Sequence, residues 1–153
     1  MFRIVLIEPE IPQNTGNIAR LCAVSKIPLL LVGKLGFHLD DKYLKRAGMD
    51  YWKFVDCNHI PIIEEYFGSV KRFAAISTKG RKLYSEINIE KDIDIDLIFG
   101  NESSGLPPFV YEKYADNLYR IPMLPEFRSL NLSSAAAIVS YHLLYKSGFP
   151  NLR

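Results

Sequence analysis

The 153-residue chain has few cysteines, few histidines and no long hydrophobic run. Its two cysteines, Cys22 and Cys57, allow one disulfide at most and lack C-x-x-C spacing, which argues against a disulfide scaffold and a zinc ribbon. The histidines lie far apart, and only Cys57 and His59 are near neighbours, so we expect no metal site. No apolar run approaches the ~20 residues that a transmembrane helix needs.

The motifs of several common enzyme classes are also absent. Neither GxxxxGK[ST] nor GxGxxG occurs, and the serines of FGNESSGLPP (99–108) lack the preceding glycine of a G-x-S-x-G elbow. These absences argue against a P-loop NTPase, a Rossmann enzyme with the usual fingerprint and an α/β-hydrolase. The N-terminus, MFRIVLIEPEIP, has no signal-peptide cleavage site, so we expect a first strand and a cytoplasmic protein.

What the sequence does have is the composition of a globular protein, with 48% hydrophobic and 24% charged residues. We expect a single domain over residues 1–153. The net charge of +2 does not by itself indicate nucleic acid. Two basic clusters together permit a polyanionic partner, although a solvated surface is the better explanation of each cluster alone: Lys42, Lys45 and Arg46, and Lys79, Arg81 and Lys82.

Apolar segments of strand length alternate with helical patterns along the chain. This alternation predicts an α/β fold, with helices around a mainly parallel sheet. The expected strands are Phe2–Ile7, Pro28–Val32, Lys53–Val55, Arg72–Ile76, Ile95–Phe99 and Asn117–Ile121. The expected helices are Thr15–Ser25, Asp40–Ala47 with Gly48 as C-cap, Pro61–Phe67, Phe109–Tyr114 and Leu132–Ser147 closed by Gly148.

The last helix is apolar around most of its circumference, and residues 133–137 are all small. A helix of this kind is buried on more than one side. It is either a central core helix or a helix shared with a second subunit. We favour the shared helix, because a peripheral helix would have a clearly polar face.

Three polar segments interrupt the apolar framework, and each follows a predicted strand. In EPEIPQNTGNIARLCA (8–23), Asn14 or Thr15 is expected to cap a helix. Asn14, Asn17 and Arg20 recur every three residues on one face, where Arg20 and the helix N-terminus could hold an anion. The other two segments are FGNESSGLPP, in which Ser103 or Ser104 is a possible helix cap, and IPMLPEFRSLNLSSAAAI (121–138).

Because the carboxyl ends of parallel strands lie at one edge of a sheet, we expect the three segments to converge there. Together with DDKYLKRAGMDYW and STKG, they resemble the motifs of the SPOUT-class RNA 2'-O-ribose methyltransferases. The resemblance extends from Phe2 to Pro150. Within that class the chain is similar to the small tRNA wobble-nucleotide (cytidine/uridine) 2'-O-methyltransferases.

The resemblance implies an α/β-knot fold with a deep C-terminal trefoil knot, which is a rare exception to the rule that chains are un-knotted. It implies S-adenosylmethionine as cofactor, tRNA as substrate and a homodimer that packs through the first and last helices. It assigns the cofactor to residues that match the family motifs: Ile76, Thr78, Gly100, Glu102, Ile121, Met123, Ser129 and Leu130.

By the same resemblance Arg20 is the catalytic residue, and Asn14, Asn17, Arg128 and Tyr141 lie toward the RNA. A guanidinium stays protonated in proteins, so we expect Arg20 to hold a phosphate and stabilise the developing alkoxide, not to act as a base. Two alternatives stay open. One is a non-catalytic RNA- or ribosome-binding protein of the same fold, and the other is an unknotted flavodoxin-like enzyme.

Overall fold

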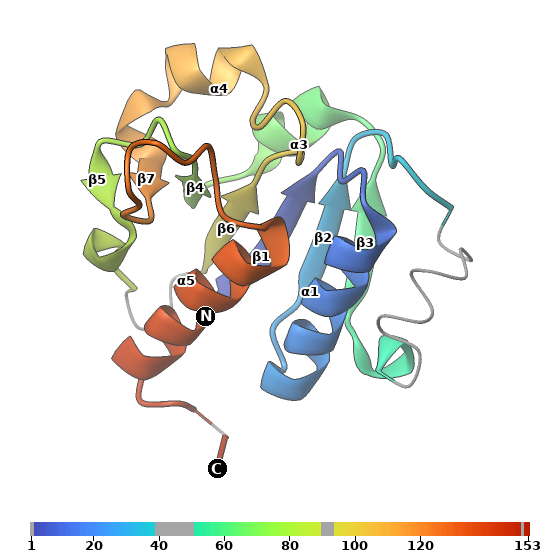
Figure 1. Cartoon of the computed structure of the whole chain (residues 1–153). Coiled ribbons are helices and arrows are strands. Elements are labelled where there is room, and N and C mark those ends of the chain that lie inside the picture. Colours follow the sequence, from blue (N-terminus) through green and yellow to red (C-terminus); the bar gives the residue numbers. More distant parts are fainter. Residues whose placement is uncertain (1, 39–50, 90–93, 151) are drawn as a thin grey trace.

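The chain forms a twisted parallel sheet covered by helices (Figure 1). The computed structural model describes residues 2–38, 51–89, 94–150 and 152–153. Within these residues the sheet has seven strands in the order β3-β2-β1-β6-β4-β7-β5, and all the strand pairs are parallel. The strands are β1 Phe2–Ile7, β2 Leu29–Val32, β3 Cys57–Ile60, β4 Phe73–Ile76, β5 Lys82–Leu83, β6 Ile95–Phe99 and β7 Leu118–Arg120. The expected α/β class is confirmed.

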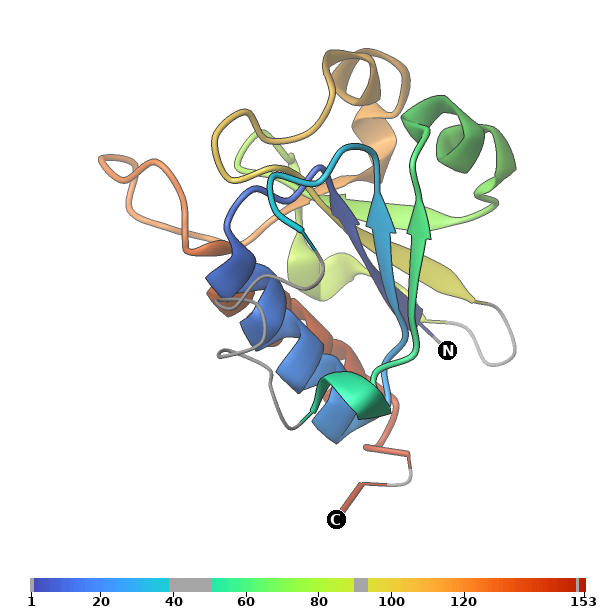
Figure 2. The same ribbon diagram turned by 90° about the vertical axis from the view of Figure 1, so that its right-hand side faces the viewer.

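Helices cover both faces of the sheet, as predicted. Figure 2 shows α1 and α5 side by side on one face, with α3 and α4 toward the other. No helix in the described part of the chain is long and apolar enough to cross a membrane. The helices are α1 Pro12–Ser25, α3 Ile63–Ser69, α4 Pro108–Lys113 and α5 Leu132–Lys146, and the short 3₁₀ turns are η1 Trp52–Phe54, η2 Tyr84–Glu86 and η3 Ala115–Asn117.

The central strands are buried on both faces, which explains why their sequences are almost continuously apolar instead of alternating, with Arg3 and Asp96 as exceptions. Side chains along a strand point to opposite faces in turn. In β1, Ile4 and Leu6 belong to the core beneath α1 and α5, whereas Val5 and Ile7 belong to the core beneath α3 and α4. One sheet therefore separates two hydrophobic layers.

One expected strand is misplaced, one short strand is missed, and one expected helix lies outside the described residues. Lys53–Val55 is not a strand, because residues 52–54 form η1 and the strand that pairs with β2 is Cys57–Ile60. This edge strand has two exposed polar side chains, Asn58 and His59, and therefore lacks an apolar run. The two-residue strand β5 is likewise too short to leave a pattern. The predicted helix Asp40–Ala47 and Gly48 fall outside the described residues.

Helix α5 buries only one side within this chain. Val139 and Leu143 are fully buried against the sheet and α1. On the opposite side Ile138, Tyr141 and Tyr145 are 38%, 46% and 71% exposed. The sharing of α5 with a second subunit stays a prediction, and so does the trefoil knot.

A buried carboxylate stabilises the end of the sheet where β1 and β6 begin. Arg3 and Asp96 are neighbours in register, and the guanidinium donates two hydrogen bonds of 3.0 and 2.7 Å to the Asp96 carboxylate. Tyr66, on α3, donates a third of 2.9 Å to the same group. Burial, with the nearby Asp96 charge, raises the pKa of the Tyr66 phenol far above its ordinary value, so Tyr66 stays a donor.

Candidate functional site

A cavity of about 850 Å³ lies where β4, β6 and β7 end. Its walls come from the loops that follow these strands and from the first turns of α1 and α5. The predicted convergence of the three polar segments is confirmed. All the residues that the resemblance assigns to a cofactor lie in the lining: Ile76, Thr78, Gly100, Glu102, Ile121, Met123, Ser129 and Leu130.

The loop after β6 closes on itself. Asn101 and Gly105 exchange two backbone hydrogen bonds of 2.9 Å, and Oδ1 of Asn101 accepts from the backbone N–H groups of Ser103 and Ser104. Gly105 has a φ of +74°, and a Cβ added to Gly100 would lie 2.3 Å from the carbonyl carbon of Gly105. Both glycines are therefore required by the turn itself.

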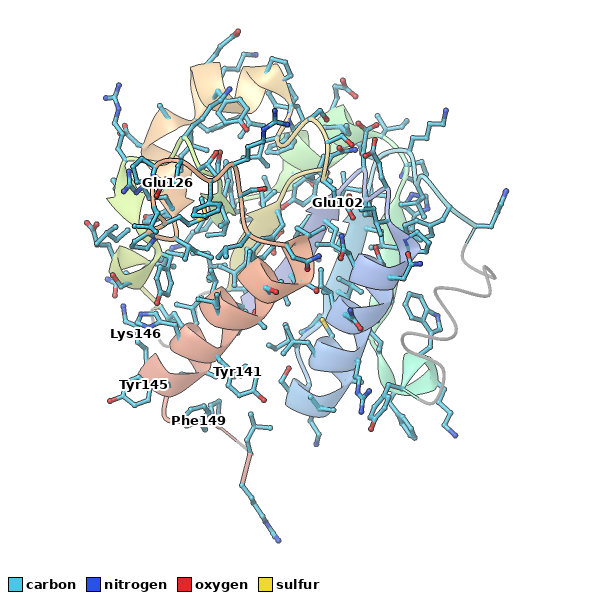
Figure 3. All side chains as sticks on the ribbon, viewed as in Figure 1. Glu102, Glu126, Tyr141, Tyr145, Lys146 and Phe149 are labelled. Carbon is cyan, nitrogen blue, oxygen red and sulfur yellow. The ribbon has the colours of Figure 1, made fainter. Side chains whose placement is uncertain are left out.

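Glu102 connects this loop to the start of α1 (Figure 3). Its carboxylate accepts hydrogen bonds from the backbone N–H groups of Glu10 at 2.9 Å and Ile11 at 3.1 Å, and from Nδ2 of Asn14 at 3.0 Å. A negative charge at a helix N-terminus is favoured by the helix dipole. The N-cap of α1 is Ile11, so the predicted capping by Asn14 or Thr15 is wrong.

Asn14 and Asn131 join the first and third segments. Asn14 is buried, and its Oδ1 accepts a hydrogen bond of 2.9 Å from Nδ2 of Asn131. Asn131 is also the N-cap of α5, where its Oδ1 accepts from the backbone N–H groups of Ser133 and Ser134. An unbroken chain of hydrogen bonds thus runs from Glu102 through Asn14 to Asn131.

Tyr111, on α4, connects the loops that follow β4 and β6. Its hydroxyl accepts a hydrogen bond of 3.2 Å from the backbone N–H of Leu106 and lies 3.4 Å from Oγ of Ser77. The ammonium group of Lys79 lies 4.4 Å from the centre of the Tyr111 ring, and both residues line the cavity. A cation is therefore placed at the rim of the cavity, over an aromatic face.

The other predicted site residues are divided between the cavity and the outer surface. Asn14 and Arg128 line the cavity, whereas Arg20, Asn17 and Tyr141 do not. Arg20 is exposed on α1, and its guanidinium carbon lies 4.7 Å from the centre of the Tyr51 ring. The structure therefore does not bring the predicted catalytic arginine into the cavity of its own chain.

Sequence reasoning missed several residues of the lining. Nothing in the sequence marks Tyr111 beyond its place in the predicted helix Phe109–Tyr114, and Asn131 directly precedes the predicted helix Leu132–Ser147. The capping position of Asn131 is a usable signal, because the first turn of α5 follows a polar loop. Ser103 and Ser104 line the cavity but do not cap α4, whose N-cap is Pro107. The residues missed include Tyr111, Asn131, Leu132 and Ala135.

The cysteines lie away from the cavity. Cys22 is buried, and Cys57 is partly buried, where desolvation raises the pKa of its thiol to about 11. Burial also raises the pKa of the Cys22 thiol, so the thiolate form of both cysteines is disfavoured. Among the described residues, no group of three or more His, Cys, Asp and Glu side chains is placed to hold a metal ion.

Comparison with known proteins identifies this arrangement of loops and cavity. The sequence matches the SpoU rRNA Methylase family over residues 1–141. The chain belongs to that family. It is 48% identical over 155 aligned positions to the tRNA (cytidine(34)-2'-O)-methyltransferase of Saccharophagus degradans, with 97% of each chain covered. It is 42% identical over 158 positions to the enzyme of the same name from Yersinia pestis, covering 98% of this chain and 96% of that one.

A solved structure described as giving insight into the 2-OH methylation of C/U34 on tRNA superimposes on the chain with a TM-score of 0.87. It is 37% identical, and 97% of each chain is covered. The SpoU family member described here therefore has the length as well as the fold of these relatives.

Proposed function

We propose that the protein transfers a methyl group from S-adenosylmethionine to the ribose 2'-hydroxyl of nucleotide 34 of tRNA, either cytidine or a modified uridine. The observation that carries the proposal is the 48% identity, over almost the whole of both chains, to a relative named for this reaction. The three polar segments that meet at the cavity support it. A cytoplasmic location is part of the same proposal.

The cavity suits S-adenosylmethionine in size and in lining. Its volume of about 850 Å³ lies within the ~300–1,000 Å³ of typical ligand sites. Apolar side chains such as Ile76 and Ile121 can cover a flat heterocycle, while Thr78 and Ser129 offer hydroxyl groups at the rim. The cofactor supplies a sulfonium methyl group that is already activated, so the protein has to orient the hydroxyl and accept its proton.

Arg20 is the residue proposed to act on the ribose. Its guanidinium stays protonated, which excludes a role as general base. It can hold the phosphate next to the reacting nucleotide and stabilise the alkoxide that develops on the 2'-oxygen. Asn17 is exposed one turn earlier on the same helix and belongs to the same RNA-facing surface in this proposal.

A homodimer through α1 and α5 is the proposed assembly. The outer side of α5 and the tail after it expose Tyr141, Tyr145 and Phe149 (Figure 3), and Val24 of α1 is 50% exposed. Exposed large apolar groups on adjacent helices are typical of an interaction surface. Since Arg20 and Tyr141 lie on these helices and outside the cavity of their own chain, a second copy would complete the site.

The experiment that tests the function is a methylation assay with labelled S-adenosylmethionine and total tRNA, followed by mapping of the methylated nucleotide. We expect label in the 2'-O-methyl group of nucleotide 34. Cofactor binding without incorporation into any RNA would favour the non-catalytic RNA-binding alternative. Failure to bind the cofactor would overturn the proposed methyl transfer.

A further inference from the structure

We propose that Glu102 is a positioning residue, which holds the start of helix α1 against the cavity loop and so sets the position of Arg20 farther along the helix, and that it does not itself bind the cofactor. The proposal rests on the function proposed above, because it concerns how Arg20 is placed for methyl transfer. It replaces the assignment of Glu102 to the cofactor that the family motif suggests.

The Glu102 carboxylate already has several protein donors. Oε1 accepts from the backbone N–H of Ile11 and from Nδ2 of Asn14, and Oε2 accepts from the backbone N–H of Glu10. A carboxylate has about four acceptor sites, so little of its capacity is left for a ligand. All three donors belong to α1 or to the residues that lead into it.

The cavity loop keeps its shape by contacts that do not involve Glu102. Asn101 donates a hydrogen bond of 2.8 Å to the carbonyl oxygen of Glu8, and its Oδ1 accepts from the backbone of Ser103 and Ser104. The backbone pairing with Gly105 closes the turn. Loss of the Glu102 carboxylate would therefore loosen the start of α1 without opening the loop, since Asn101 and Ser103 still hold Glu8 and Glu10.

Asn14 extends the connection to the third segment and to the position of Arg20. It is the third residue of α1, and it bonds both Glu102 and Asn131. Arg20 follows six residues later on the same rigid helix, about 9 Å along its axis at ~1.5 Å per residue. A displacement at the start of α1 is therefore carried to the guanidinium.

The test compares Glu102→Gln with a matched control, Glu112→Gln, on the exposed surface of α4. Calorimetry gives the Kd for S-adenosylmethionine, and single-turnover assays at saturating tRNA give the rate of methyl transfer. For Glu102→Gln we expect a Kd within about threefold of wild type. The rate should fall about 10- to 100-fold, because a misplacement of ~1 Å can cost about 100-fold. The control should change neither quantity.

Hydrogen exchange provides a measurement that does not depend on activity. In Glu102→Gln at least one of the backbone amides of Glu10 and Ile11 should exchange faster, because they donate to different carboxylate oxygens and glutamine keeps only one oxygen. Should Glu102→Gln fail to fold, Asn14→Ala removes one of the three donors to the Glu102 carboxylate and the acceptor for Asn131, and it should also lower the rate with the Kd within about threefold of wild type.

Two results would overturn the proposal. One is a Kd raised more than about tenfold, with these amides still protected, which would assign Glu102 to the cofactor. The other is a variant that methylates at the wild-type rate. An inactive wild-type protein would instead refute the proposed function, and the Kd and the exchange rates would still decide whether Glu102 contacts the cofactor or α1.

Discussion

The side-chain amide of Asn131 donates a hydrogen bond of 2.9 Å to Oδ1 of Asn14, 117 positions earlier in the chain. The bond fixes which way the buried Asn14 amide faces, since the other end of that amide donates to Glu102. One short hydrogen-bonded chain therefore joins the starts of two helices to the loop between them.

Because the turn after β6 is closed, we expect two glycine substitutions to differ sharply in their effects on stability and on cofactor binding. Gly100→Ala would place a Cβ 2.3 Å from the backbone of Gly105, and overpacking of this kind costs about 1–3 kcal/mol. We expect a lower Tm and at least about tenfold weaker binding of S-adenosylmethionine by calorimetry. Gly68→Ala in α3 is the control, because its new Cβ meets no atom within 4 Å. Wild-type binding by Gly100→Ala would show that closure of the turn is dispensable.

Mixed dimers would show whether Arg20 serves the cavity of its own chain or that of a second copy. Arg20→Ala and Gly100→Ala are each expected to be inactive alone. If Arg20 acts across the interface, a mixture that has exchanged subunits contains sites with an intact arginine and an intact cavity. Methyl transfer should then recover to about a quarter of the wild-type rate, as random pairing predicts. No recovery after verified exchange would contradict the arrangement across two chains.

The partly buried Cys57 thiol leads us to expect that the stability of the fold decreases at alkaline pH. Burial raises the pKa of its thiol from 9.0 to about 11, so the folded state retains a proton that the unfolded state loses in this range. The contribution of Cys57 to stability is therefore complete below pH 9 and is lost as the pH rises toward 11. Denaturant titrations of wild type and Cys57→Ala at several pH values should show a steeper loss in wild type, because the buried Cys22 and Tyr66, whose pKa values are also raised, are present in both proteins. If the free energy of unfolding falls equally steeply with pH in the two proteins, the Cys57 thiol is exposed to solvent.

The buried carboxylate at the opposite edge of the sheet predicts a loss of stability without a loss of function. Tyr66→Phe removes the hydroxyl that donates to Asp96 at 2.9 Å. A buried acceptor that loses a partner costs about 1–3 kcal/mol. We expect a correspondingly lower free energy of unfolding in urea, with an unchanged Kd for S-adenosylmethionine. A weaker affinity would mean that this edge of the sheet communicates with the cavity.

The features that could be predicted from the sequence are those encoded locally. Continuous apolar runs located β1, β2 and β6 closely, since strands buried on both faces leave no alternation. The polar segments at the ends of strands were sufficient to place the cavity at the carboxyl edge of the sheet. β3 was misplaced by a few residues because an edge strand with exposed Asn58 and His59 has no such run.

The features that could not be predicted depend on residues far apart in the chain. Local propensity favoured Asn14 or Thr15 as the cap of α1, but the carboxylate of Glu102, about 90 positions away, occupies that place. The helix then begins at Pro12, three residues earlier than expected. Sequence spacing also placed Asn14, Asn17 and Arg20 on one face, but could not show that only Asn14 reaches the cavity.

The location of Asn131, Leu132 and Ala135 in the cavity wall has a consequence for biosynthesis. These residues follow all the described strands in the chain, so a ribosome has made the whole described sheet before the wall can form. A nascent chain therefore cannot bind S-adenosylmethionine before the last helix, α5, has been made. Binding of the cofactor shows that α5 has docked. Since a ligand that binds only the folded state stabilises it, the cofactor would act on the final step of maturation.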